Sequence, residues 1–520
     1  MGTINPVVHL RVVVFVSGLS VMAVEMTGLR LLAPFFGTSL LVTTILIGSM
    51  MGFLSAGYAL GGRFGDRDPT LAGLCRVMAV AGGLVIAIPF LGQPILRTAA
   101  ATIRPLLQGE NLAEPQVAIA MVVGGLLGIL GLFAAPVTLM GMVSPWAVRL
   151  AVDDVESAGK AAGRLYAIST FGSILGSFLP ALLLIPMLGV RNTFLVVGTG
   201  LLAVSVPAIL GRAKGAAATA MCLPLFFVPS GMVRPMPGLV MEQESLYHFI
   251  QVVVEPYGKC PKANHLYLNE GIGVHSVKCL DPAIETRGTW AYMASAALYR
   301  PDPSTTADVL IVGLAGGTVA RQLLEAWPEA HVDGVEIDGA VVRVGEQYFD
   351  NDDPRISSFV MDGRVFLQAT DKKYSVILMD AYRQPYIPFH LTTVEFWREV
   401  AEHLDEDGVV GINVASVRGQ SRGLAVRIYK TMREVFPSVH FLDATTSNDI
   451  LFATARETHK HLAADNLDKM PRALGLDQIR SKLRKKTFGA VRGWEEAEVL
   501  TDDQAPVEMV WDLMTLEYAR

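Results

Sequence analysis

Charged residues are scarce in this sequence, and the scarcity is concentrated in its first half. Only 18% of the 520 residues are Asp, Glu, Lys or Arg, 51% are hydrophobic, and the mean hydropathy is +0.41. These values are too apolar for an ordinary soluble protein of this length. Beyond about residue 233, charges recur every few residues and the hydrophobic runs shorten. The change predicts a membrane region followed by a region in water.

Cysteine and clustered positive charge are also rare. The cysteines are Cys75, Cys222, Cys260 and Cys279, and no pair has the CxxC spacing of common zinc sites, so we expect no metal. A net charge of −6 without a basic stripe argues against nucleic acid as a partner. The first apolar segment lacks a small-residue cleavage pattern, so we interpret it as a retained membrane span.

Several apolar stretches reach the length of about 20 residues that a helix needs to cross a bilayer. They are residues 10–33, 39–61, 71–95, 116–144, 165–188 and 192–211, with a shorter seventh stretch at 216–233. We therefore predict a multi-pass domain of six or seven helices over residues 1–233. Paired glycines at four-residue spacing predict close helix packing. These pairs are Gly48 and Gly52, Gly57 and Gly61, Gly124 and Gly128, and Gly172 and Gly176.

The distribution of Lys and Arg between the ends of the spans predicts the orientation. One side collects eight of them: Arg11, Arg63, Arg67, Arg149, Lys160, Arg164, Arg212 and Lys214. The other side collects four: Arg30, Arg97, Arg104 and Arg191. We therefore expect a cytoplasmic N-terminus. If 216–233 is re-entrant, which we favour, the C-terminal half is cytoplasmic as well. Glu25, inside the first span, is equally compatible with a functional role and with an ion pair to Arg30 or Arg149.

The second half is divided by its pattern into a linker at 234–241, a small β-strand region at 242–284, a Rossmann-like domain at 285–460 and a helical extension at 461–520. Alternating polar and apolar residues predict short strands in the β-region, and a helical stretch near 288–299 follows. Alternating strands and helices then predict a parallel α/β sheet. The strands expected are 249–255, 265–269, 273–278, 308–312, 331–337, 357–361, 375–379, 409–414, 439–442 and 450–454.

Residues suited to ligand binding follow four successive strands of the predicted α/β sheet. The first strand ends in a turn containing Gly313, Gly316 and Gly317, and the second ends at Glu336, 23 residues after Gly313 (336 − 313). That is near the spacing at which an acid binds ribose hydroxyls. The next two strands lead into Asp362-Gly363 and Asp380. Carboxyl ends of parallel strands share one edge, so these residues predict a nucleoside site there. The turn lacks GxGxxG spacing, which favours a mononucleoside such as the adenosine of S-adenosylmethionine.

The motifs in this half resemble those of the spermidine synthase family over roughly 242–455, and the first half is similar to its membrane-fused branch. The fold implied is a polytopic α-helical membrane domain joined to an α/β Rossmann-like, S-adenosylmethionine-type domain with a small β-region before it. The motifs are Glu244–Val252, Val309–Thr318, Val335–Asp338, Asp353–Ile356, Met361–Arg364, Tyr374–Tyr382 and Ile387–Thr393, with Glu25, Arg30–Pro34, Gly163–Ala167 and Gly172 in the first half.

The resemblance implies an aminopropyltransferase that uses decarboxylated S-adenosylmethionine as co-substrate, with no tightly bound cofactor and no metal. Asp380 would be the catalytic base, Glu336 would hold the ribose, and Asp362 with Gly363 would meet the adenine. His248 and the glycines at 313, 316 and 317 would complete the nucleoside site. A small, putrescine-like amine would contact Tyr247, Tyr382, Arg383 and Pro388. The implied setting is the cell membrane, in contact with the lipid bilayer, and a homo-oligomer is among the states to expect.

Departures from the family pattern leave the acceptor open. The aspartate that holds the aminopropyl ammonium in the family is Gly316 here, the usual glutamine after the tyrosine is His248, and the second aspartate of the catalytic loop is Arg383. The acid usual in the helix before the Rossmann part falls near Ala291. Two alternatives therefore remain: an S-adenosylmethionine-dependent transferase acting on another, membrane-proximal substrate, and a transporter or sensor whose domain only binds an adenosyl ligand.

Cys260 and Cys279 bear on the compartment. A hairpin of the strands 265–269 and 273–278 would bring Cys279 near the turn that carries Cys260, so a disulfide is geometrically possible. Disulfides persist mainly in oxidising compartments. The family's nucleoside substrates are made in the cytoplasm, and we therefore expect two free thiols and a cytoplasmic catalytic domain.

Overall fold

The computed structural model divides the chain into two compact units, which we describe separately. The first comprises residues 1–112, 116–235 and 244–249, and the second comprises the remainder. The structure describes residues 5–36, 40–103, 114–152, 158–228, 233–269, 273–281, 288–382, 386–416, 423–445, 447–469, 480, 483–484, 491–508 and 510.

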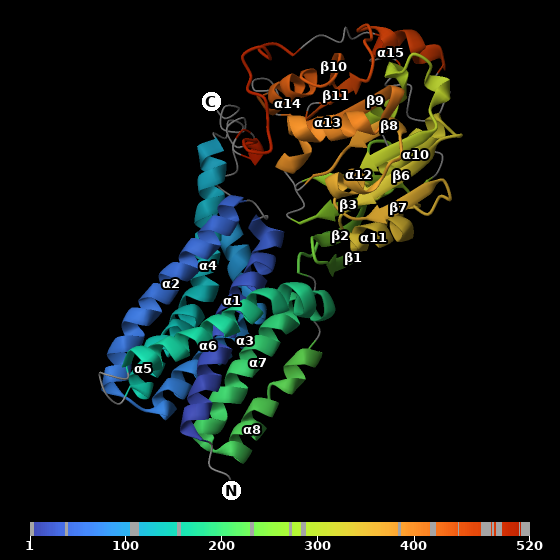
Figure 1. Ribbon diagram of the computed structural model, residues 1–520. Coiled ribbons are helices and arrows are strands. Elements are labelled where there is room, and N and C mark those ends of the chain that lie inside the picture. Colours follow the sequence, from blue (N-terminus) through green and yellow to red (C-terminus); the bar gives the residue numbers. More distant parts are fainter. Residues whose placement is uncertain are drawn as a thin grey trace. The chain divides into compact units, whose positions relative to one another are not determined.

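The first unit is a bundle of long apolar helices (Figure 1). Five helices in the described part are long and apolar enough to cross a membrane, as expected of a multi-pass protein. The last of them, of 53 residues, comprises α6 and α7 and is broken at Gly189, whose φ of 76° is left-handed. The elements are α1 (Pro6–Phe36), α2 (Leu40–Arg67), α3 (Leu71–Ile103), α4 (Glu114–Gly141), α5 (Val143–Ala151), α6 (Ala158–Leu179), a π-helical turn (Pro180–Leu184), α7 (Ile185–Leu210), α8 (Arg212–Ala220) and a 3₁₀ turn (Leu223–Phe227).

Glycines set the closest helix contacts. A Cβ added at Gly172 or Gly176 would lie 2.3 or 2.1 Å from carbonyl oxygens of α1, and one added at Gly57 or Gly61 would lie 2.3 or 2.4 Å from carbonyl oxygens of residues 138 and 142. The sequence prediction is confirmed for these two pairs. It is wrong for the pair at 48 and 52, where an added Cβ meets no described atom within 4 Å. Spacing alone does not tell which face of a helix is packed.

The described residues 212–228 and 233–234 lead back to the end of the bundle where α1 finishes. Figure 1 shows α8 starting at the opposite end, beside the start of α1. The Arg191 side chain, just after the break at Gly189, donates to the Leu225 carbonyl (2.9 Å). Arg97, late in α3, donates to the Val233 carbonyl (3.4 Å), and Arg234 donates to the Pro34 carbonyl of α1 (3.3 Å). The chain therefore leaves the bundle at the end opposite to its start.

Arg149 was one of the two partners considered for Glu25. It pairs instead with Asp66, at the end of α2, at 3.2 Å. Glu25 itself is 8% exposed within α1.

The second unit joins a small sheet to a larger one. The small sheet has the order β1-β2-β3-β4, with β1 (Leu239–Glu244), β2 (Phe249–Tyr257), β3 (Cys260–Leu268) and β4 (Val274–Cys279). The larger has the order β10-β11-β9-β8-β5-β6-β7. Its strands are β5 (Asp308–Val312), β6 (His331–Glu336), β7 (Ile356–Val360), β8 (Tyr374–Met379), β9 (Leu404–Ala415), β10 (Ser438–Asp443) and β11 (Asn448–Thr454).

Helices cover both faces of the larger sheet. One apolar core joins it to α9 (Thr289–Met293), the 3₁₀ turn Ala294–Tyr299 and α10 (Thr318–Ala326). The core of the other face joins it to α12 (Gly363–Ala369), α13 (Val394–Glu402) and α14 (Gly423–Arg433), and includes Leu500 and Val507 of the last segment. Helix α11 (Gly339–Phe349) packs on β2 and β3.

The predicted strands of the Rossmann-like part are all present. The strands β7, β6, β5, β8 and β9 pair in parallel. Strand β11 runs antiparallel to both of its neighbours, β9 and β10, so the expectation of a parallel sheet is wrong at that edge. The short connection between β10 and β11 explains this, because a parallel pair requires a crossover of a dozen or more residues. Strand β1 was not predicted.

We predict that Gly176→Leu destabilises the helical unit by at least about 1–3 kcal/mol, because the new side chain meets the α1 backbone. Gly52→Leu is the matched control, since an added Cβ there has no described neighbour. Thermal unfolding of the purified protein in detergent measures both. Equal midpoints for the two variants would contradict the packing described.

Candidate active site

Four neighbouring strands bring the predicted ligand-binding residues to one edge of the larger sheet. In the parallel registers Val312 lies opposite Val335 and Met379, and Glu336 lies opposite Val360. The glycine turn after β5, Glu336 at the end of β6, Asp362 after β7 and Asp380 after β8 therefore meet at the carboxyl ends. The sheet's connections diverge here, since β5 is flanked by β6 on one side and β8 on the other. This is where open α/β sheets bind ligands.

The turn after β5 requires glycine at two positions. Gly313 has φ 90°, and a Cβ there would lie 2.5 Å from the Asp380 carbonyl oxygen. Gly317, which precedes α10, has φ 75°, and a Cβ there would lie 2.1 Å from Asn351 Oδ1. Between them Ala315 is also left-handed, at φ 49°. The turn thus lies against the backbone that carries Asp380.

Glu336 is tied to this turn. Its side chain is buried and accepts hydrogen bonds from the backbone N–H of Ala315 (3.0 Å) and of Asp338 (3.3 Å). The acid therefore connects the glycine turn to the end of β6. A sugar bound between the two elements would find this carboxylate already oriented.

Gly316 has no room for a side chain. An added Cβ would lie 2.8 Å from Ser276 Cβ and 3.0 Å from the Phe349 ring. Both neighbours are fully buried, and the Gly316 N–H donates to Ser276 Oγ at 2.9 Å. The position that carries an aspartate in the family pattern is therefore closed by packing here.

Arg321 of α10 fastens the same turn to β4. It donates to the carbonyls of Gly316 (2.9 Å) and Val277 (3.1 Å), and also to the Phe349 carbonyl. Burial lowers the pKa of Arg321 to about 10, so the group stays charged at neutral pH. Thr318 adds reciprocal hydrogen bonds to Val277, each of 3.1 Å. The small sheet therefore supports the carboxyl edge of the larger one.

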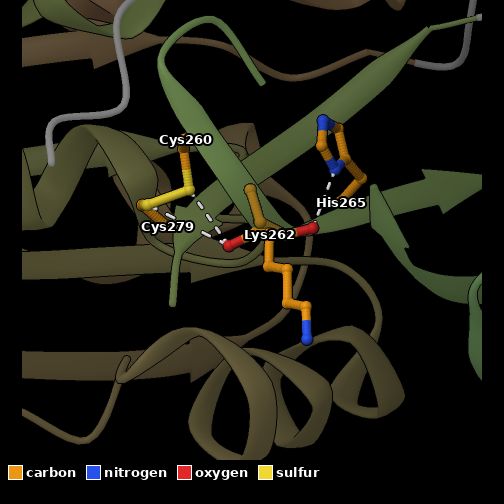
Figure 2. The surroundings of a disulfide bond; sticks show 5 residues. Cys260, Lys262, His265 and Cys279 are labelled. Atoms are coloured by element: carbon orange, nitrogen blue, oxygen red, sulfur yellow. Dashed lines mark hydrogen bonds between the residues drawn. A yellow bond between two sulfur atoms is a disulfide. The ribbon is translucent and has the colours of Figure 1, made fainter. Parts of the chain in front are cut away.

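A disulfide secures the end of β4. Cys260, at the start of β3, is bonded to Cys279, with Cα atoms 5.9 Å apart, beside the carbonyl of Lys262 (Figure 2). The expectation of free thiols is therefore wrong. The β3–β4 register explains the pairing, because Ala263 lies opposite Cys279 and the β2–β3 turn places Cys260 next to it. Ser276 and Val277, which hold the glycine turn and α10, lie only a few residues before this bond.

Asp362 caps α12 and pairs with His390. Its carboxylate accepts from the backbone N–H groups of Arg364 (2.9 Å) and Val365 (3.2 Å), and His390 Nε2 lies 3.0 Å from Oδ2. The His390 hydrogen bond holds the pKa of Asp362 below its usual range. A Cβ at Gly363 would lie 2.2 Å from Val312 Cγ1, so glycine lets α12 start against β5. Sequence reasoning missed His390, although it lies in a quoted motif.

Asp380 follows β8 at this edge. It is only partly exposed, and Asn413 Nδ2 of β9 donates to its Oδ1 at 2.8 Å. Burial raises the pKa of Asp380 to about 7, and the Asn413 hydrogen bond opposes the rise. The Tyr382 hydroxyl donates to the Asn413 carbonyl and accepts from the Ala415 N–H, both at 2.8 Å. Burial, then the charge of Asp380, raises the pKa of Tyr382. Asn413 was not found from the sequence.

The remaining predicted residues are dispersed. Tyr247 and His248 lie in the β1–β2 turn, within the part of the chain grouped with the first unit, where Ser245 Oγ accepts from the His248 N–H at 2.8 Å. Pro388 precedes the 3₁₀ turn Phe389–Leu391. Arg383 lies outside the described residues. Within the described ranges, no group of three or more His, Cys, Asp or Glu side chains is arranged to hold a metal ion.

Comparison with known proteins identifies the family. Residues 295–449, which include all four strand ends of this edge, match the spermine/spermidine synthase domain. A "Probable polyamine aminopropyl transferase" of Bifidobacterium longum is 30% identical over 314 residues, which are 55% of this chain and 67% of that protein. The chain belongs to the spermidine synthase (polyamine aminopropyltransferase) family. This is a family of transferases that use decarboxylated S-adenosylmethionine.

Other relatives cover less. A polyamine aminopropyltransferase of Vibrio vulnificus is 33% identical over 187 residues, 34% of this chain and 60% of its own length. Among solved structures, a probable spermidine synthase from Corynebacterium glutamicum superposes with a TM-score of 0.37 at 19% identity, covering 50% of this chain and 99% of that one. Spermidine synthase from Thermotoga maritima gives a TM-score of 0.39 at 16% identity over 50% of this chain and 86% of that one.

We predict that the double variant Cys260→Ala, Cys279→Ala loses about 2–4 kcal/mol of stability in the second unit, as expected for opening a short disulfide loop. Cys222→Ala serves as control, because Cys222 is unbonded. Denaturant unfolding of the oxidised full-length protein, with and without reductant, measures the effect. Identical curves for wild type under both conditions would show that the bridge contributes nothing.

Proposed function

We propose that the protein transfers an aminopropyl group from decarboxylated S-adenosylmethionine to an amine, with Asp380 as the general base. The observation that carries the proposal is the position of Asp380 beside the glycine turn, with a pKa of about 7. A base with that pKa is about half ionised at neutral pH, which suits proton transfer there. Pure ligand binding, as in a sensor or transporter, does not call for such a group.

The nucleoside half of the site follows from the same edge. Glu336 would accept the ribose hydroxyls, and Asp362 with Gly363 would bound the adenine. The backbone of the turn at Gly313, Gly316 and Gly317 would border the nucleoside. His390 enters this proposal as a new contact, since it already engages Asp362 Oδ2 (3.0 Å) where the base would bind.

The reaction needs little besides alignment. The amine nitrogen attacks the aminopropyl carbon next to the sulfonium, a C–N bond forms and the C–S bond breaks. Methylthioadenosine leaves as a neutral thioether and needs no proton. The attacking nitrogen gives up one proton, which Asp380 accepts. Positioning and one base therefore suffice.

The closure at Gly316 bears on the acceptor. The closed position at Gly316 offers no carboxylate to an ammonium group, and an unpaired desolvated ammonium costs several kcal/mol, on the order of a lost buried ion pair. Tyr382, Arg383 and Pro388 remain the proposed acceptor contacts. The same closure favours, as a second candidate, transfer from an S-adenosylmethionine-type donor to another, membrane-proximal acceptor. Product analysis with putrescine as the first acceptor tested separates the two.

We further propose that the catalytic unit lies outside the cytoplasm, in place of the cytoplasmic location expected from the sequence. The chain leaves the helical unit at the end opposite to the start of α1, as the contacts of Leu225, Val233 and Arg234 indicate. The end that holds the start of α1 carries most of the loop Lys and Arg residues, which favours the cytoplasm for that end. The Cys260–Cys279 disulfide supports an oxidising compartment independently.

The base assignment predicts a pH profile. A carboxyl group accepts a proton only when ionised, so kcat/KM should rise with pH through about 7 and level off above it. Asp380→Asn should lower turnover by on the order of 10²–10⁴-fold, while methylthioadenosine affinity by calorimetry stays within a few-fold. The exposed Asp371→Asn is the control for the same chemical change. Turnover in Asp380→Asn at the level of the control would remove the base and the proposed mechanism.

The location predicts accessibility. In a Cys222→Ser background, Glu457→Cys places an exposed thiol on the catalytic unit and Lys160→Cys places one at the start of α6. A membrane-impermeant maleimide should label the first in intact cells and the second only after permeabilisation. The reverse pattern would put the catalytic unit in the cytoplasm.

A further inference from the structure

Asp380 is held through a chain of two side-chain amides that crosses three strands. Asp380 follows β8, Asn413 lies on β9 one residue beyond the partner of Met379, and Asn448 begins β11. Asn448 Nδ2 donates to Asn413 Oδ1 at 3.0 Å, and Asn413 Nδ2 donates to Asp380 Oδ1 at 2.8 Å. The chain therefore runs in one direction, from donor to acceptor, and ends on the carboxylate.

The direction of the chain is fixed at the carboxylate. The two ends of an amide are told apart only by their hydrogen-bond partners. An ionised carboxylate can only accept hydrogen bonds, so Asn413 presents its amino group to Asp380 Oδ1 and its carbonyl to Asn448. Asn448 then donates to Asn413, and its own Oδ1 accepts from the hydroxyls of Thr445 (3.3 Å) and Ser447 (3.2 Å).

A second contact holds the backbone around the base. Tyr382, two residues after Asp380, bridges the Asn413 carbonyl and the Ala415 N–H at 2.8 Å each. The segment that leaves β8 is thereby fixed on β9. The described hydrogen bonds engage one carboxylate oxygen of Asp380 and leave Oδ2 for the substrate.

We propose that Asn413 and Asn448 are positioning residues for Asp380, which hold Oδ1 and present Oδ2 to the attacking amine. This inference rests on the proposed role of Asp380 as base. Electrostatics support it, because the Asn413 hydrogen bond lowers a pKa that burial has raised. Tyr382 is a titratable group on the same segment, and burial together with the charge of Asp380 raises its pKa. Asp449, next to Asn448, alternates to the other face of β11.

Reversing the amide chain tests the proposal. In Asn448→Asp the new carboxylate cannot donate to Asn413 Oδ1, so Asn413 should rotate its amino group toward residue 448 and its carbonyl toward Asp380. The rise of kcat/KM with pH should then move upward by more than about one pH unit, and by about one unit in Asn413→Ala, where a charge-assisted hydrogen bond is lost. Asn448→Ala should give a smaller shift.

Controls separate positioning from folding and from the base assignment. Thr445→Ala touches only the acceptor end of Asn448 and should keep the wild-type pH profile. Methylthioadenosine affinity should be retained in every variant, since none contacts the nucleoside edge. A wild-type profile in both Asn448→Asp and Asn413→Ala, with Asp380→Asn inactive, would overturn the positioning role alone. Activity in Asp380→Asn would instead overturn the proposed function.

Discussion

The contact between Gly313 and the Asp380 backbone is the constraint on which the candidate site depends. A side chain at Gly313 would lie 2.5 Å from the Asp380 carbonyl oxygen, and the Asp380 N–H donates to the Val312 carbonyl at 2.8 Å. These contacts hold the end of β8 against the turn that follows β5. In the proposed function, a nucleoside bound over the turn would lie beside this acid. Glu336 extends the same arrangement to β6 through the Ala315 N–H.

The acids at the carboxyl edge of the larger sheet could be predicted because each lies at or just after the end of a strand. Glu336 ends β6, Asp362 lies two residues after β7 and Asp380 directly follows β8, and parallel pairing then brings them together. Asn413 and Asn448 carry no such signal. One lies within β9 and the other begins a strand that pairs antiparallel with it, so their meeting depends on register, which the sequence pattern does not specify. The Cys260–Cys279 bond could be predicted only in part. The expected hairpin brings the two cysteines close together, but it does not tell whether they are oxidised.

The closed position at Gly316 shows how the small sheet and the nucleoside edge depend on each other. Ser276 and Phe349 fill the space that a larger residue would need, and Arg321 then uses the exposed backbone carbonyl of the same glycine. Restoring an aspartate at 316 would therefore require changes on β4 and α11 as well. The loss of this acid is built into the packing of three elements, and a search for the acceptor should begin from a site without it.

Topology and chemistry constrain each other in the proposed arrangement. An oxidising compartment accounts for the disulfide, and the exit of the chain opposite to the start of α1 agrees with it. The same location separates Asp380 from nucleosides made in the cytoplasm. The donor must then cross the membrane or arise outside, and only a site exposed to that compartment could use it. A cytoplasmic catalytic unit would remove this difficulty, but it would leave the bond between Cys260 and Cys279 in a reducing environment and require the basic end of the bundle to face outward. A cytoplasmic catalytic unit would thus conflict with both the disulfide and the distribution of Lys and Arg in the loops, and we therefore propose that the unit lies outside the cytoplasm.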